Sequence, residues 1–101
     1  MSITDVEFDA MEDVEFCKKQ ITGFKNGINV IEYHKHFAIE KIKYLRRQYG
    51  EDYQSVAIIR LQERIKEYES DINLYKGKIE KYEAEIESMR TKFMLTNDQI
   101  I

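Results

Sequence analysis

Apolar residues in the second half of the chain recur at alternating spacings of three and four residues. The series begins at Ile58 and reaches Phe93 without a break. A heptad pattern kept over five repeats is typical of a long helix that packs along its length against another helix. It predicts a helix over about residues 52–96. The apolar positions are Ile58, Leu61, Ile65, Tyr68, Ile72, Tyr75, Ile79, Tyr82, Ile86, Met89 and Phe93.

A weaker seam of the same kind runs through the first half, over residues 10–49, where Lys35 interrupts it. Thr4 followed by Glu7 forms a capping box, which is a signal for a helix N-terminus. The stretch GFKNG, residues 23–27, contains two glycines and favours a kink or a short loop. The elements expected here are helices over about 4–22 and 29–49, separated by a kink or loop over 23–28.

A chain reversal is predicted between the two halves. Gly50 stands where a helix C-terminus takes a residue of positive φ, and Asp52 stands where the next helix takes an N-cap. In an antiparallel hairpin the numbers of facing residues sum to a constant, and the two seams pair throughout at a sum of 103. This sum centres the reversal on the same turn. The predicted fold is a single all-α domain over 1–101, a long antiparallel helical hairpin with coiled-coil heptads and a turn at 50–51.

Charges beside the second seam favour association between chains. In a parallel in-register pair, each residue at heptad position g faces the position-e residue five places on in the other chain. The four such pairs, which all attract, are Arg64 with Glu69, Asp71 with Lys76, Lys78 with Glu83 and Glu85 with Arg90. Alternating signs also satisfy one antiparallel register, so association is predicted without its direction.

Apolar residues away from the first seam also point to self-association. They are Phe8, Met11, Phe16, Val30, Tyr33, Phe37 and Tyr44. A lone hairpin would leave many of them in water. The sequence therefore predicts a homodimer, a coiled-coil or four-helix-bundle-like assembly. Its interface is assigned to the second seam, from Ile58 to Met89.

Composition places the chain among soluble helical proteins of one domain, with 101 residues, no proline and 35% charged residues. No stretch approaches the roughly 18 apolar residues of a spanning helix, and the acidic N-terminus does not resemble a signal peptide. A single cysteine, Cys17, excludes an internal disulfide and fits a reducing compartment. The expected location is the cytoplasm, without membrane contact. Preference for Ile, Lys and Tyr over Ala and Pro suggests an AT-rich genome, as in a low-GC bacterium or a phage.

Charge is distributed unevenly along the chain. Residues 1–34 carry a net charge of −4, residues 35–66 carry +4 and residues 67–101 carry −3. The basic third lies around the turn, and its candidate contacts for a protein partner or for nucleic acid are Lys41, Lys43, Arg46, Arg47, Arg60 and Arg64. Basic groups beside aromatic rings hold phosphate and stack on bases, although a solvated helix end also explains them. The overall charge of −3 argues against tight, sequence-blind binding to long DNA.

The tetrapeptide Asp-Val-Glu-Phe occurs twice in DVEFDAMEDVEF, residues 5–16. One interpretation is structural, because acids favour a helix N-terminus and Val6, Val14 and Phe16 can join a bundle core. The other is an acidic handle, in which Val6, Phe8 and Phe16 bind a basic groove. The sequence alone leaves both open.

Patterns for catalysis or cofactor binding are nearly absent. His34 and His36 point to different sides of a helix, and the stripe of Glu32, His36 and Glu40 lacks the paired motif of di-iron bundles. No basic residue lies three or four positions from Cys17, where it could lower the pKa of the thiol. We therefore expect no catalytic, cofactor-binding or metal-binding residue, and no enzyme. The leading hypothesis is a homo-oligomeric adaptor, scaffold or small inhibitor that presents helical surfaces to a protein, and the alternative is a nucleic-acid-associated protein.

Overall fold

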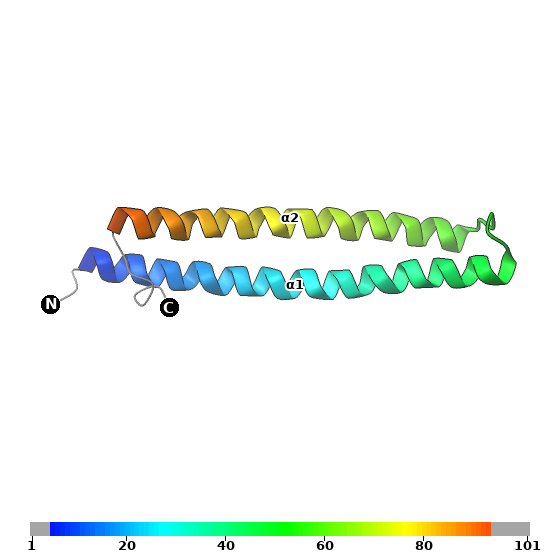
Figure 1. The fold of residues 1–101 in the computed structure, drawn as a ribbon, viewed down its shortest axis with the longest axis horizontal. Coiled ribbons are helices and arrows are strands. Elements are labelled where there is room, and N and C mark those ends of the chain that lie inside the picture. Colours follow the sequence, from blue (N-terminus) through cyan, green and yellow to red (C-terminus); the bar gives the residue numbers. More distant parts are fainter. Residues whose placement is uncertain (1–4, 94–101) are drawn as a thin grey trace. The chain divides into compact units, whose positions relative to one another are not determined.

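Two helices make up the chain. The computed structural model describes residues 5–93, and side-chain surroundings from Phe8 onward. Helix α1 spans Asp5–Tyr49 and helix α2 spans Val56–Phe93. They pack antiparallel as a helical hairpin (Figure 1), which confirms the predicted all-α fold. The capping box at Thr4 and the helix end predicted near residue 96 lie outside the described residues.

The helix pair divides into two units. Unit 1 comprises residues 1–25 and 76–101, and unit 2 comprises residues 26–75. In unit 1, Ala10 and Val14 are buried, and Met11, Ile86, Met89 and Phe93 pack around them. The other buried apolar residues of unit 1 are Cys17, Ile21 and Ile79, and those of unit 2 are Ala38, Ile42, Ile58 and Ile72. Each unit thus has its own core, built from the seam residues of both helices.

Contacts between the helices test the predicted register within each unit. They include an ion pair of 3.5 Å between Lys35 and Glu69. The others are Cys17 with Glu85, Phe16 and Phe24 with Tyr82, and His34 with Tyr68. The residue numbers in these pairs sum to between 98 and 106, on either side of the predicted 103. Lys35, which interrupts the apolar seam of the first helix, therefore faces α2 and pairs there with Glu69.

The turn is longer than predicted, and its cap is a different residue. Gly50 has a φ of 112° and its N–H donates to the Arg46 carbonyl at 2.8 Å, so it ends α1 as the sequence indicated. Asp52, however, lies in the turn, and α2 begins at Val56. Ser55 is the N-cap, because its hydroxyl accepts a hydrogen bond from the Ile58 N–H at 3.3 Å. The predictions of a turn at 50–51 and a helix start near 52 were therefore wrong.

A kink or a loop was predicted over 23–28. The loop is wrong, because α1 continues through these residues. A glycine inside a helix costs only about 1 kcal/mol relative to alanine, which is less than an interrupted helix would lose in packing. Gly27 has a packing role instead. A Cβ atom at this position would lie 2.8 Å from Cε2 of Tyr75, so the missing side chain lets that ring lie against the α1 backbone.

The second seam lies against α1 in both units. All ten residues assigned to an oligomer interface are buried or half-buried within the single chain, and Ile58, Ile72 and Ile79 are buried. A second chain cannot cover those buried residues without displacing α1. Self-association therefore stays a prediction, and a face other than this seam has to carry it.

Replacement of Ile72 by Asp is expected to destabilise the fold by about 3 kcal/mol or more, because it buries an unpaired carboxylate. Leu74 is the matched control, since it is 57% exposed two residues further along α2. Leu74→Asp should change the free energy of unfolding by no more than about 0.5 kcal/mol. Urea denaturation followed by circular dichroism measures both. Equal losses would mean that the seam is not where the structure places it.

Two helical glycines should respond differently to alanine. Gly77→Ala is expected to stabilise the protein by about 1 kcal/mol, because a Cβ there meets nothing within 4 Å. Gly27→Ala should gain less or lose stability, because the Tyr75 ring has to move away. Thermal denaturation compares them. In a Tyr75→Ala background the deficit of Gly27→Ala should disappear, and its persistence would contradict this explanation.

Candidate functional site

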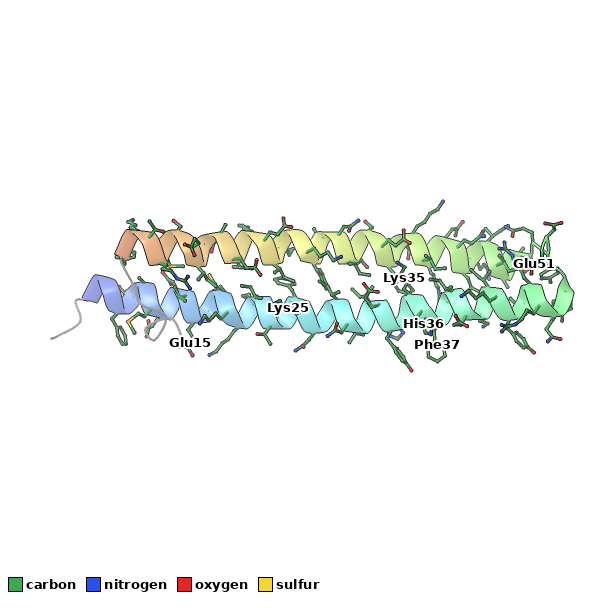
Figure 2. All side chains as sticks on the ribbon, in the orientation of Figure 1. Glu15, Lys25, Lys35, His36, Phe37 and Glu51 are labelled. Carbon is green, nitrogen blue, oxygen red and sulfur yellow. The ribbon has the colours of Figure 1, made fainter. Side chains whose placement is uncertain are left out.

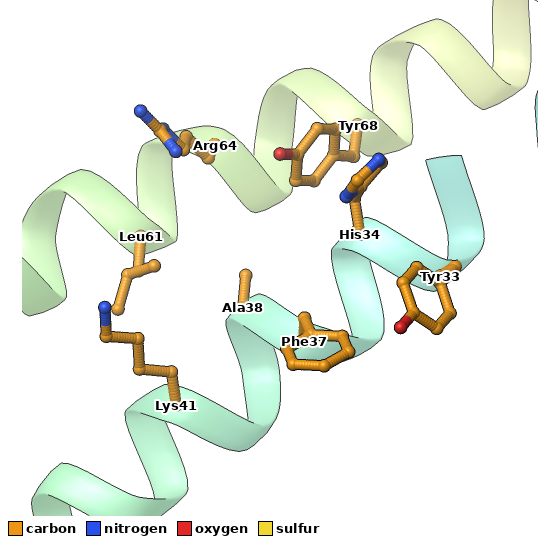
Figure 3. A pocket seen from close by; sticks show the side chains of 8 residues that line it. All are labelled: Tyr33, His34, Phe37, Ala38, Lys41, Leu61, Arg64 and Tyr68. Atoms are coloured by element: carbon orange, nitrogen blue, oxygen red, sulfur yellow. The ribbon is translucent and has the colours of Figure 1, made fainter. Parts of the chain in front are cut away.

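A groove of about 390 Å³ lies between the two helices of unit 2 (Figure 3). Its lining is aromatic and basic: Tyr33, His34, Phe37, Ala38 and Lys41 come from α1, and Leu61, Arg64 and Tyr68 come from α2. We call it the basic groove. It includes two of the basic residues singled out in the sequence, Lys41 and Arg64.

Small residues on the seam explain the hollow. Ala38 is buried at a seam position where larger residues would fill the space below Leu61. Aromatic rings lie on both sides of Ala38. The His34 ring stacks on Tyr68 with centroids 6.3 Å apart. On the outer side, the Tyr33 and Phe37 rings are 5.1 Å apart.

Phe37 points away from α2, whereas Lys35 points toward it (Figure 2). Phe37 and Tyr33 are each 60% exposed. Large apolar side chains at this exposure, gathered at the edge of a groove, are typical of binding surfaces. The basic groove thus has an apolar rim that the chain itself does not cover.

The charged residues that line the groove are both basic. Lys41 and Arg64 have no ion-pair partner among the described residues. A neighbouring hollow of about 440 Å³ shares both residues, and its lining also includes Arg60, Glu63 and Glu67. The arrangement favours an anionic ligand that also has apolar surface, such as a carboxylate-bearing helix.

Two of the other predicted basic contacts, Lys43 and Arg46, have partners elsewhere in the chain. Lys43 lies 3.3 Å from the Glu40 carboxylate, and Arg46 donates to the Gln54 side chain at 3.4 Å. Arg47 is exposed in the last turn of α1. The structure therefore brings Lys41, Arg60 and Arg64 together and separates them from the residues at the helix end.

The acidic repeat is partly exposed and partly buried in unit 1. Phe8 and Phe16 are 54% and 55% exposed, and the side chain of Val6 lies outside the described residues. Val14 is fully buried, so the structural interpretation holds for Val14 and is wrong for Phe16. Phe16 lines a hollow of about 460 Å³, and the lining also includes Asp13 and Glu85. We call it the acidic groove.

Cys17 is the nucleophile candidate nearest to these surfaces. It is buried, and its thiol donates to the Glu85 carboxylate at 3.5 Å. Burial, then the hydrogen bond and the negative charge of Glu85, raise the pKa of the thiol above its ordinary value of 9.0. A protonated, buried thiol is a poor nucleophile. In the part of the chain that the structure describes, no three His, Cys, Asp or Glu side chains are placed to hold a metal ion.

Sequence reasoning selected the charges of the groove. It placed Tyr33 and Phe37 off the first seam and Tyr68 on the second, but it did not predict that these residues and His34 line one groove. A signal for the outer ones was present. Phe16, Val30, Phe37 and Tyr44 are spaced by multiples of seven residues, so they return to one face of a helix just as a seam does.

Comparisons of the chain with protein-family models, curated proteins and solved structures found no match. Within residues 5–93, neither helix combines the length and the apolar character that crossing a membrane requires.

The raised pKa of Cys17 predicts a pH-dependent contribution to stability. Because the folded state favours the protonated thiol, the contribution is complete below the ordinary pKa of 9.0 and is lost as the pH rises above it. Cys17→Ala lacks this dependence. The difference in unfolding free energy between the wild type and Cys17→Ala should therefore shrink from about pH 8 to pH 10. A constant difference would mean that the thiol is not shielded as its contacts indicate.

Proposed function

We propose that this chain is a non-catalytic protein-interaction module, an adaptor, scaffold or small inhibitor that presents helical surfaces and self-associates. The observation that carries the proposal is the exposed apolar face of α1. Six of its members are more than half exposed: Phe8, Phe16, Val30, Tyr33, Phe37 and Tyr44. A chain of this size seldom keeps so many large apolar side chains in water unless another surface covers them.

The basic groove is our choice for the contact with a different protein. Its rim of Tyr33 and Phe37 supplies apolar area, and Lys41 and Arg64 supply charge without a local partner. The partner expected from this chemistry is an acidic amphipathic helix, because such a helix matches both properties. A cytoplasmic location agrees with the free thiol of Cys17. Coiled-coil packing of the seams and a four-helix assembly of two chains belong to the same proposal.

A second candidate function rests on the end of α1. The Tyr49 and Tyr53 rings stack with centroids 4.7 Å apart, and Tyr49 is 65% exposed. Arg46 and Arg47 lie in the same last turn. Exposed aromatic rings beside cations bind single-stranded nucleic acid by stacking and phosphate contacts. This candidate is the weaker one, because Arg46 already bonds Gln54.

Two sets of charge reversals separate these functions. Lys41→Glu with Arg64→Glu changes the basic groove, and Lys43→Glu with Arg46→Glu and Arg47→Glu changes the helix end. Each set should alter stability by at most about 1–2 kcal/mol, since all of these side chains are exposed except that of Arg46, which is half-buried. We expect the groove variant to lose a protein captured by the wild type from the native host, while the helix-end variant keeps it.

The captured protein is to be identified by mass spectrometry and titrated in purified form against both variants. Fluorescence anisotropy with single-stranded and duplex oligonucleotides tests the second candidate. Salt-sensitive oligonucleotide binding that only the helix-end variant loses would favour the nucleic-acid function over the one proposed here.

A further inference from the structure

The two units present opposite charges around similar apolar rims. In unit 1, Phe16 lies beside Asp13 and Glu85 in the acidic groove. In unit 2, Phe37 lies beside Lys41 and Arg64 in the basic groove. Phe16 and Phe37 are 21 residues apart and so occupy the same heptad position of α1. The grooves of the two units are therefore opposite in charge, and each has a phenylalanine in its lining.

The exposed face of α1 is also complementary to itself when reversed. An antiparallel copy at a register sum of 53 places Phe16 opposite Phe37, and Gly23 opposite Val30. Asp9 falls opposite Tyr44 in the same row. Beside these central pairs, on the side of α1 that faces the basic groove, facing residue numbers sum to 54. Asp13 there lies opposite Lys41 of the other copy. One register thus pairs two phenylalanines in the middle of each contact and an acid with a base beside them.

We propose that the occupant of the basic groove rim is α1 of a second copy of this chain, in an antiparallel dimer with a two-fold axis near residues 26 and 27. Unit 1 of each copy contacts unit 2 of the other. Phe16 packs against the partner's Phe37, and Asp13 pairs with the partner's Lys41. This inference rests on the proposed function, for which it names the self-association surface.

Charge along α1 decides the direction. Residues 5–25 contain six acids and three lysines, for a net charge of −3, and residues 26–49 contain two acids and five bases, for +3. A parallel pair would bring like charges together over both halves, whereas an antiparallel pair brings opposite charges together twice. The opposing net charges favour a reversed copy of the same helix over a copy in the same direction.

One pair in this register is unfavourable. A register sum of 52 on the outer side brings Glu12 near the partner's Glu40. The repulsion is reduced because Glu40 lies 3.3 Å from Lys43 in its own chain. Glu40→Lys removes the repulsion and is therefore expected to tighten the dimer, by a few-fold in the dissociation constant.

The main test exchanges charges between two exposed positions of α1. Light scattering of the purified wild type should give twice the chain mass of 12.2 kDa at micromolar concentration. Asp13→Lys alone and Lys41→Asp alone should each weaken the dimer by at least about tenfold, because each creates two repulsive pairs. The double variant restores both attractive pairs and should recover the dimer. An equimolar mixture of the two single variants should recover it as well.

The single variants separate the two directions. In a parallel dimer, position 13 would face position 13 and position 41 would face position 41, so the wild type and every variant would carry two like-charge pairs and the single variants would dimerise as the wild type does. Single variants that dimerise as tightly as the wild type, a double variant that stays weak, or a monomeric wild type would overturn the proposal. Circular dichroism checks that each variant remains helical.

Apolar substitutions give an independent readout. Phe37→Ser should weaken the dimer by at least about tenfold, because a half-exposed phenylalanine at the centre of an interface dominates its affinity. Leu74→Ser is the matched control, with 57% exposure in the same unit but on α2. The control should dimerise as the wild type does. If Phe37→Ser dimerises as tightly as the control, the proposal fails.

Failure of this inference is distinguishable from failure of the proposed function. A monomeric wild type that still binds a foreign acidic protein through Lys41 and Arg64 would overturn the dimer and leave the adaptor function in place. A dimer that passes the charge exchange, without any foreign partner, would support the inference and remove the adaptor.

Discussion

Burial of one apolar stripe by another is the interaction on which the structure depends. Neither helix is stable with its seam in water, because a helix in a protein gains most of its stability by packing its apolar face against another element. Gly50 and Ser55 fix where the chain reverses, and the reversal determines which residues meet. The cores of both units, the place of Lys35 opposite Glu69 and the hollow at Ala38 all follow from that single register.

Because the seams are used within the chain, function has to come from what lies beside them. The largest deviation from a filled seam is at Ala38, where a small side chain leaves room under Leu61. Two cations at the flanks, Lys41 and Arg64, would repel each other across this space if nothing compensated them. An arrangement that is unfavourable in the isolated chain becomes favourable when an anionic surface binds, which is why the groove is the best candidate for recognition.

Periodicity and turn chemistry were sufficient to predict the helical hairpin, its register and the role of Gly50. They failed where tertiary packing outweighs a local signal. Gly27 was interpreted as part of a kink or loop, but it lies inside α1 and leaves room for the ring of Tyr75. Asp52 and Ser55 are both good caps, and sequence alone does not say how many residues the reversal needs.

The basic members of the site were predictable because charge is visible in the sequence. Two aromatic members, Tyr33 and Phe37, were predicted to be exposed because they lie off the seam. Their place beside the groove was not predicted, because such spacing does not say which exposed residues gather around a hollow. For Phe16 the sequence left a core position and an exposed position open. The structure decides for the exposed one, since Phe16 lies one residue from buried Cys17 and yet is more than half exposed.

The two proposals are linked by the residues that they share. Tyr33, Phe37 and Lys41 belong both to the basic groove and to the face of α1 that a second copy would cover. A foreign acidic helix and the acidic half of α1 would then compete for one surface, since both supply carboxylates beside apolar side chains. In a dimer without a foreign partner, α1 of the second copy would occupy the rim of the basic groove. The partner would therefore bind with an affinity reduced by the free energy of the dimer, and it would release monomers as it binds.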